Sequence, residues 1–349
     1  MPPSAAVEVD ILGMSKKLKA AVIGCGNIGA SVKNYGRAVR PGSHASAYQA
    51  NAKTKLAALV ENDKDKWPGL KNDFPRVKIY EDADLMFKEI KPDIVSIATP
   101  TGSHYKFVLM AAKYKCPAIL CEKPISYSVQ EAKKMILACQ KSNSQLFINH
   151  TRHFDPLLQK WSRKVRNGFL GQIYQGNAYY YNGLFNNGTH LIDLLRMFLG
   201  EIDWVAVQYN KKTSWQEKDL NVDGLIAFKN GALISFQSLS KNYGYFGFSL
   251  FGEKRMINVT NLAYEIEYRK KIRNENYKGF FELSSEISKE GAPRSFMKSA
   301  IGHVVSCLEG KTAPQSTGQN GLAVLEILMT LASSAQQHGK KLYLKKKNE

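Results

Sequence analysis

The chain has 349 residues and a formal net charge of +19, with 44% hydrophobic and 23% charged residues. This length favours two domains, and this composition excludes broad disorder and a fibrous architecture. The longest apolar run, 322–335, is interrupted by Glu326 and falls short of the roughly 20 residues that span a bilayer, so we expect no membrane segment.

The charge and the cysteines bear on partners and location. Positive charge attracts anions, and the alternatives are nucleic acid, a phosphorylated cofactor or substrate, and a merely solubilising surface. No helix-turn-helix, zinc-finger or RNP motif accompanies the scattered basic residues, so we expect no nucleic-acid partner. Residues 1–16 lack the pattern of a signal peptide and are expected to form a disordered lead. Five cysteines without a Cys-x-x-Cys pair indicate reduced thiols in the cytoplasm.

Short apolar runs alternate with helical patterns from residue 18 to residue 148. Such alternation is typical of βαβ units, so we predict a Rossmann domain, a doubly wound parallel sheet, over 17–125. The predicted strands are 19–23, 56–60, 77–80, 94–98, 118–121 and 146–148. The predicted helices include 43–51, 83–90, 105–114 and 129–142, the last opened by Ser128 and Glu131 as a capping box.

Longer alternating runs follow a helix at 156–167. Strands are predicted at 173–181, 204–209, 224–228, 232–238, 246–251 and 264–268, with Asn230-Gly231 as a hairpin turn. Helices return at 296–308 and 321–337, before a short strand at 342–344. We therefore predict an α+β domain over 126–349 with a large, mostly antiparallel open sheet. Helix 128–142 and strand 146–148 lie at the junction and are able to pack on the first sheet.

A glycine-rich turn follows the first predicted strand. Gly24, Gly26 and Gly29, with Asn27 and Ile28 between the last two, have the G-x-G-x-x-G spacing at a strand-to-helix turn. The first glycine permits the tight turn, the second lets a pyrophosphate approach the backbone, and the third lets helix pack on strand, with phosphate at the positive helix end. The turn predicts a dinucleotide site, against the alternative of a Rossmann-like domain that binds no nucleotide.

An acidic residue stands where the dinucleotide fingerprint requires one. Glu61 ends the second predicted strand, where a carboxylate binds the ribose hydroxyls and repels a 2′-phosphate. We therefore expect NAD rather than NADP, although Lys64 and Lys66 weaken that preference. Glu61 follows Gly29 by 32 positions, farther than the usual roughly 20 from the first glycine, and an insertion at 31–42 accounts for the difference.

Three further segments carry chemically useful side chains. Thr99, Pro100, Thr101 and His104 follow the fourth strand, and Glu122 and Lys123 follow the fifth. Because open α/β sheets bind ligands at the carboxyl ends of their strands, both turns are expected to face the nicotinamide. Downstream, Asn186-Asn187-Gly188-Thr189-His190 opens an apolar helix, on which His190 and Asp193 are expected to share a face.

These segments resemble the glucose-fructose oxidoreductase / inositol dehydrogenase family (Gfo/Idh/MocA), from about Lys17 to Leu344. The most specific piece is Glu122-Lys123-Pro124. The resemblance implies that Lys123 contacts the reacting hydroxyl and the cofactor, and that His190 completes the site. The family's aspartate four residues before this histidine is replaced by Asn186. Asparagine cannot accept a proton, so the base must be His190 or a Lys123 of lowered pKa.

The remaining assignments follow from the same reading. Catalytic residues are Lys123, His190 and Asn186, and the expected cofactor contacts are Gly24, Gly26, Asn27, Ile28, Gly29, Glu61, Thr99, Pro100, Thr101, His104, Glu122 and Lys123. The expected substrate contacts are Arg152, Asn186, Thr189 and Asp193. Purely structural roles stay open for each of the side chains: a turn lysine, a helix-terminal histidine, or an Arg152 that forms an ion pair or braces the hinge. No metal site is expected, because no cluster has ligand spacing.

The function expected from this resemblance is NAD-dependent oxidation of a CH–OH group in a sugar or nucleotide sugar. The Asn-Gly-Thr-His variant resembles members associated with amino-sugar metabolism for surface polysaccharides. A homodimer or homotetramer is expected to form through the open sheet face, since an exposed apolar face would be a liability. The alternatives are a reductase of a cyclic ketone or imine, and a catalytically inactive protein that senses dinucleotides.

Overall fold

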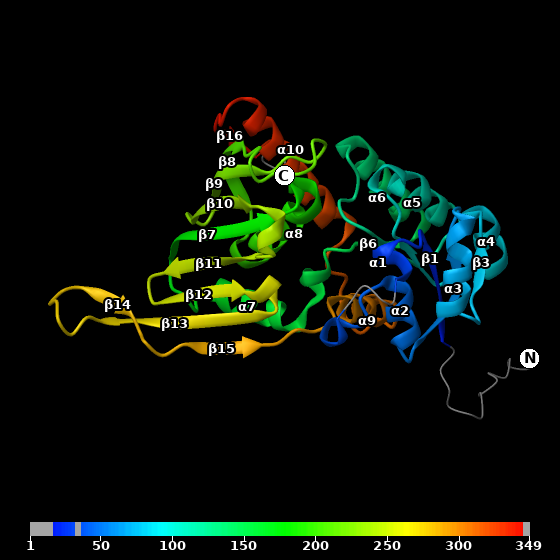
Figure 1. The fold of residues 1–349 in the computed structure, drawn as a ribbon, viewed down its shortest axis with the longest axis horizontal. Coiled ribbons are helices and arrows are strands. Elements are labelled where there is room, and N and C mark those ends of the chain that lie inside the picture. The colour runs from blue at the N-terminus through cyan, green and yellow to red at the C-terminus, as the bar shows by residue number, and fades with distance from the viewer. Residues whose placement is uncertain (1–16, 32–35, 345–349) are drawn as a thin grey trace, which may run out of the picture.

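The computed structural model describes residues 17–31 and 36–344, and these form two sheets with helices packed on them (Figure 1). The lead expected at 1–16 lies outside the described residues. Within the described residues, no helix is long and apolar enough to cross a bilayer.

The first sheet is parallel, with six strands in the order β3-β2-β1-β4-β5-β6. The strands are β1 (Leu18–Ile23), β2 (Thr54–Val60), β3 (Lys78–Tyr80), β4 (Ile94–Ile97), β5 (Ala118–Cys121) and β6 (Gln145–Ile148). Their apolar side chains are almost all buried, as expected for strands covered by helices on both faces. The order reverses between β1 and β4, so the turns after these strands lie at the crevice where such sheets bind ligands. The doubly wound Rossmann fold is confirmed.

In the described ranges, six α-helices connect these strands. They are α1 (Asn27–Ala30), α2 (His44–Ala50), α3 (Trp67–Asp73), α4 (Ala83–Ile90), α5 (His104–Lys113) and α6 (Val129–Ser142). The Ser128 hydroxyl accepts the Glu131 backbone N–H, as expected of a cap, but the Glu131 carboxylate binds the Ser126 hydroxyl instead. Half of the predicted capping box is therefore formed. In the predicted insertion, the described residues include a short 3-10 turn, η1 (Arg37–Val39), while 32–35 lie outside the description.

The second sheet is mixed and mostly antiparallel, with ten strands among the described residues. They are β7 (Ile173–Tyr181), β8 (Ile202–Tyr209), β9 (Val222–Phe228), β10 (Leu233–Leu239), β11 (Gly247–Gly252), β12 (Arg255–Thr260), β13 (Glu265–Arg273), β14 (Phe281–Leu283), β15 (Ser288–Gly291) and β16 (Leu342–Tyr343). The Asn230-Gly231 hairpin joins β9 to β10, with Gly231 at φ 90°. One pair, β7 with β10, is parallel. Strands β12, β14 and β15 were not predicted.

One face of this sheet is covered by helices and the other is open. Ile234 and Phe236 of β10 are buried, whereas Ser235, between them, lies on the opposite face, where Leu225 of β9 is exposed. The oligomer expected through this open face stays a prediction. In Figure 1, β13 and β14 extend beyond the rest of the sheet as an arm.

Four helices complete the fold: α7 (Pro156–Arg166), α8 (Thr189–Leu199), α9 (Phe296–Leu308) and α10 (Gly318–Gln336). Although α9 follows the second sheet in sequence, its Ala300 and Ile301 are buried in the apolar core beneath the first sheet. Leu325 of α10 packs against α6, while Leu328 joins the core of the second sheet. These two helices therefore tie the two sheets together, and Figure 1 shows α9 beside α2.

Candidate active site

The glycine loop joins β1 to α1. Gly24 has a positive φ of 89°, and a Cβ there would lie 2.8 Å from Thr99 Cγ2. A Cβ on Gly29 would lie 1.9 Å from the Gly24 carbonyl oxygen, so the helix packs too closely on the turn for any side chain. Around Gly26, in contrast, the position of a Cβ is open. Gly24 and Gly29 therefore shape the turn. Gly26 leaves the outer side of the turn accessible, just before Asn27 and Ile28 begin α1.

Glu61 lies directly after β2 and beside this loop, as the sequence predicts. Its carboxylate accepts the backbone N–H of Cys25 at 3.0 Å and that of Asp63 at 3.0 Å. The Glu61 side chain is buried, and Lys66 Nζ lies 3.6 Å from one carboxylate oxygen. A carboxylate is therefore held at the edge of the glycine turn, with one cation next to it.

The turn after β4 contains four of the expected cofactor residues, Thr99, Pro100, Thr101 and His104. His104 is buried, and its ring nitrogens face two backbone carbonyls, that of Thr99 at 2.9 Å and that of Pro124 at 3.0 Å. Desolvation lowers the pKa of His104. A neutral imidazole carries one N–H and donates to one of these carbonyls, so His104 links the turns after β4 and β5, and its expected contact with the cofactor stays a prediction.

Lys123 reaches across to the second half of the chain. Its ammonium donates to the backbone oxygen of Asn186 at 3.1 Å and to the Asn186 side-chain oxygen at 2.9 Å. Asn186 lies in the π-helical turn η5 (Gly183–Gly188), which leads into α8. Burial lowers the pKa of Lys123, the Glu122 charge raises it, and Arg152 lowers it. An ammonium has three N–H donors, so these contacts leave one donor for a substrate oxygen.

Glu122 lies in a buried polar cluster, and its expected contact with the cofactor stays a prediction. His44 Nε2 is 2.9 Å from Glu122 Oε1, and Asn149 Nδ2 donates to the same oxygen at 2.6 Å. Burial opposes ionisation of the Glu122 carboxyl. His44, through its hydrogen bond and its charge, favours ionisation, and so do Lys123 and Asn149. Their effect outweighs burial and lowers the pKa of Glu122 to about 2. A buried charge requires such partners, and they occupy the oxygen.

His190 lies in the first turn of α8 and is almost fully buried. Its ring meets the His150 ring edge to face, with centroids 5.9 Å apart. Among the described residues, Nδ1 of His190 has no hydrogen-bond partner. Burial lowers the pKa of His190 well below its ordinary value, and the charges of Lys123 and Arg152 lower it further. The imidazole is therefore neutral near pH 7 and can accept a proton.

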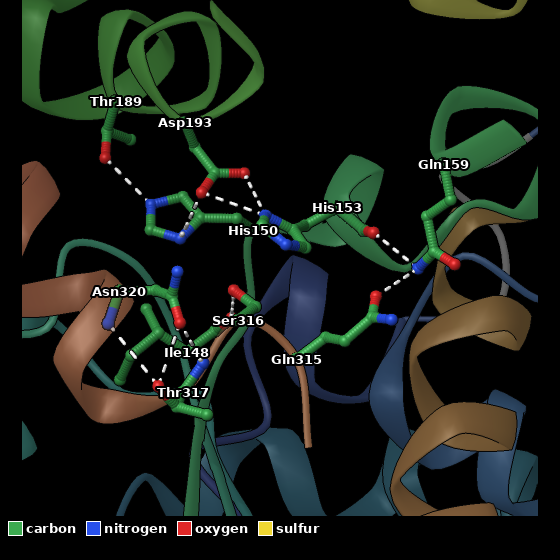
Figure 2. Close-up of polar contacts among 10 residues, drawn as sticks. All are labelled: Ile148, His150, His153, Gln159, Thr189, Asp193, Gln315, Ser316, Thr317 and Asn320. Atoms are coloured by element: carbon green, nitrogen blue, oxygen red, sulfur yellow. Dashed lines mark hydrogen bonds and ion pairs between the residues drawn. The ribbon is translucent and has the colours of Figure 1, made fainter. Parts of the chain in front are cut away.

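The helix face next to His190 binds two other histidines. The Thr189 hydroxyl lies 3.1 Å from His150 Nε2, and Asp193 Oδ2 lies 2.9 Å from His153 Nδ1. Figure 2 shows both contacts. His150 Nδ1 is also 3.9 Å from Asp193 Oδ1. Thr189 and Asp193, four residues apart, share a helix face that packs on η4 (Thr151–Phe154). Both are buried, and Asp193 orients His153 rather than His190, while their expected contact with substrate stays a prediction.

Arg152 lies between aromatic rings. Its guanidinium carbon is 4.3 Å from the centre of the Phe246 ring and 5.4 Å from that of Phe296, and Nε donates to the Leu262 carbonyl at 3.2 Å. Burial lowers the pKa of Arg152 to about 10. Within the described part of the chain, no carboxylate lies within 4 Å of it, so the alternative of a structural ion pair is not realised.

The fold thus brings Lys123, Asn186, His190 and Arg152 together from four separate segments. Two groups of supporting residues were missed by the sequence reasoning: His44 with Asn149, and His150 with His153. The segment 149–153 had been noticed only for its arginine, and no local pattern linked it to α8. Over the described ranges, no group of three His, Cys, Asp or Glu residues could hold a metal ion. Away from this site, an open hollow on the second sheet is lined mainly by residues 206–212.

The chain is similar to known proteins in sequence. A model of the oxidoreductase family with an NAD-binding Rossmann fold (GFO_IDH_MocA) matches residues 18–150, and a model of the GFO/IDH/MocA C-terminal domain matches residues 181–258. A D-apiose dehydrogenase from Paraburkholderia graminis is 22% identical over 350 residues, which cover 92% of this chain and 88% of that protein.

Solved structures share the whole fold. The WlbA dehydrogenase from Bordetella pertussis, in complex with NADH and UDP-GlcNAcA, is 18% identical with a TM-score of 0.75, covering 95% of this chain and 100% of that chain. A levoglucosan dehydrogenase in complex with NADH and levoglucosan is 17% identical with a TM-score of 0.77, again over 95% and 100%. These likenesses establish the fold, and the two family models establish the membership. The chain belongs to the Gfo/Idh/MocA family of oxidoreductases, with its NAD-binding Rossmann domain and its C-terminal domain.

Proposed function

We propose that this protein is an NAD-dependent dehydrogenase that interconverts a CH–OH group and a ketone in a sugar or nucleotide sugar. The observation that carries the proposal is the contact of Lys123 with Asn186, which joins the carboxyl end of β5 to the start of α8 beside a neutral His190. A cation and a proton acceptor are thereby held in one site at the sheet edge where dinucleotides bind.

The glycine turn fits a dinucleotide. The open position at Gly26 leaves backbone accessible to a pyrophosphate, whereas side chains at Gly24 or Gly29 would clash with the turn itself. Glu61 is held where it would bind the adenosine ribose, and its charge disfavours a 2′-phosphate. NAD is therefore preferred, with the discrimination reduced by Lys66 at 3.6 Å. When bound, the nicotinamide supplies the two-electron acceptor.

The protein's own part in the reaction is to move a proton and stabilise charge. His190 is neutral near pH 7 and is the residue to which we assign the hydroxyl proton, although burial and the two nearby cations oppose its protonation. The Lys123 ammonium stabilises the negative charge that develops on the substrate oxygen, an effect strengthened where water is excluded. Asn186 cannot take a proton, and its side-chain oxygen holds Lys123 in place.

The substrate class is inferred from the pocket and from relatives. Arg152 has donors that no carboxylate of the described chain occupies, and with Lys123 it gives the site positive character suited to an oxygen-rich or acidic sugar. The relatives named above include enzymes of D-apiose and levoglucosan, and one crystallised with UDP-GlcNAcA. A role in amino-sugar metabolism for surface polysaccharides is the finer form of the proposal.

Turnover with NAD⁺ tests the proposal. The purified chain is incubated with NAD⁺ and a panel of aldoses, sugar acids and UDP-sugars, and the absorbance of NADH is followed. For the substrate that reacts, K123M and H190Q are expected to lower kcat by roughly 10²- to 10⁴-fold, the usual contribution of proton transfer and charge stabilisation. K71M, which removes an exposed lysine of α3, serves as the control and is expected to leave kcat unchanged.

Other outcomes of this assay would support the alternatives. Tight NADH binding without turnover of any sugar would favour a dinucleotide-sensing protein. In a parallel assay with NADH and cyclic ketones or imines, turnover restricted to those compounds would favour a reductase of that class. Full activity of K123M would contradict the proposed role of the lysine.

A further inference from the structure

Asp219 lies in the loop between β8 and β9 and reaches the turn that carries Asn186. One carboxylate oxygen accepts the backbone N–H of Phe185 at 2.9 Å, and the other accepts that of Asn186 at 3.0 Å. Gly183 makes this approach possible: it has φ 92°, and a Cβ there would lie 2.1 Å from Asp219 Oδ2. The Asp219 carboxylate is therefore hydrogen-bonded to the backbone of η5, including that of Asn186, whose side-chain oxygen binds Lys123.

The position of Asp219 matters for the charge balance around Lys123. The ammonium is bound by two neutral oxygens, both from Asn186. The charged and titratable groups that act on Lys123, or on which it acts, are Glu122 of the same turn, Arg152 and His150 of the segment after β6, His190 of α8 and Asp219. The carboxylate of Glu122 is already paired with His44. In the described chain, Asp219 forms no ion pair within 4 Å. Burial raises the pKa of its carboxyl, and the backbone N–H groups of the Asn186 turn and the Lys123 charge counteract that rise.

We propose that Asp219 is a positioning residue of this site, which holds Asn186 against the Lys123 ammonium and supplies the negative charge that the neutral amide of Asn186 lacks. The kinetic part of this inference rests on the proposed dehydrogenase function, whereas the charge relation between Asp219 and Lys123 does not. Asp219 thus adds to the charge of Glu122, which raises the pKa of Lys123 more strongly, in compensating an ammonium whose two direct contacts are neutral.

The direction of the effect follows from the electrostatics. Burial lowers the pKa of Lys123, and the Asp219 charge raises it. Neutralising Asp219 therefore lowers the pKa of Lys123. An opposite charge in close contact shifts a pKa by about 1 to 3 units, and Asp219 acts from behind Asn186, so a shift of up to about one unit is expected. Since Lys123 acts in its ammonium form, the alkaline limb of the pH profile of kcat/KM should move to lower pH.

The test compares three variants at the two positions with one control. D219N removes the charge, N186D places a charge directly beside the ammonium, and D219N/N186D moves the charge from one position to the other. E217Q removes an exposed acid from the same loop and is the matched control. Two quantities are measured: the pH profile of kcat/KM, and the pKa of Lys123 from the pH dependence of its acetylation, followed by mass spectrometry without cofactor or substrate.

D219N is expected to lower the Lys123 pKa and to reduce kcat/KM by up to about ten-fold above that pKa, as a one-unit shift requires. The double variant should return both quantities toward the wild type, and E217Q should change neither. An unchanged pKa of Lys123 in D219N, or the same shift in E217Q, would overturn the inference. A loss of stability alone would also overturn it, because a purely structural carboxylate would not move the pKa.

The double variant also covers the case in which D219N does not fold. Comparing N186D with D219N/N186D removes the Asp219 charge in a chain whose ammonium keeps a carboxylate beside it, and the Lys123 pKa should be lower in the double variant. An equal Lys123 pKa in these two variants would count against the inference. Failure of the proposed function is distinguishable. If no substrate reacts but D219N lowers the Lys123 pKa, the charge relation holds and the dehydrogenase assignment fails.

Discussion

Replacing Glu122 by glutamine removes the charge from a carboxylate buried between His44 and Asn149. The size of the effect follows from the pKa of Glu122, which is lowered from 4.5 to about 2. A difference of about 2.5 units corresponds to roughly 3 kcal/mol of folding free energy, at about 1.4 kcal/mol per unit. We therefore expect E122Q to lower the free energy of unfolding at pH 7 by that order, as the breaking of a buried pair usually does.

The stability that the Glu122 charge contributes depends on pH. The folded-state pKa of Glu122 is depressed, so its stabilisation is fully present above about pH 4.5 and is lost as the pH falls toward about 2. The difference in stability between wild type and E122Q should therefore be largest near pH 7 and smaller near pH 3.5.

Urea unfolding followed by tryptophan fluorescence measures both points. E81Q is the control, because Glu81 pairs with Lys64 on the surface, where both side chains are more than half exposed and such pairs contribute little. The reasoning is refuted if E122Q is no less stable than E81Q at pH 7, or if the deficit of E122Q is the same at pH 7 and pH 3.5.

Three further predictions concern the glycine loop and the histidine pair. G26A should keep the melting temperature of the wild type, because its Cβ meets nothing in the protein. It should lose NADH binding, measured by fluorescence titration, because that Cβ would occupy the open side of the turn. Retained binding would contradict the assigned pyrophosphate site. G29A should instead lower the melting temperature, because its Cβ would lie 1.9 Å from a backbone oxygen. Burial lowers the pKa of His153 and the Asp193 charge outweighs it, so D193N should lower that pKa, measured by NMR titration; no change would show that Asp193 does not charge-stabilise the ring.

Local patterns predicted most of the elements well. Helices 83–90, 129–142 and 296–308 and strand 173–181 were predicted with the bounds that the structure has. These segments combine a clear hydrophobic period with caps or turns, and such signals act within a few residues. Strands β14 and β15 were missed because their residues are largely exposed and lack an apolar alternation.

The candidate site was predicted in part. The lysine after β5 and the histidine of α8 could be recognised from motifs in the turns that carry them. Their neighbours could not, because Glu122 meets His44 across 78 positions and Lys123 meets Asn186 across 63. The contacts of His104 could not be predicted either. It lies in a turn expected to face the ligand, yet both of its ring nitrogens lie close to backbone carbonyls.

The sequence by itself determined the parallel sheet, the glycine turn with Glu61 beside it, and the identity of the lysine and histidine that the family resemblance singled out. Periodicity and the backbone freedom of glycine are properties of short segments, so they can be read without knowing the fold. Only the tertiary structure decided that α9 returns to the first sheet, that Asp193 binds His153, and that Asp219 stands behind Asn186. Burial and pairing of charges depend on which segments the packing brings together, and that is a property of the whole chain.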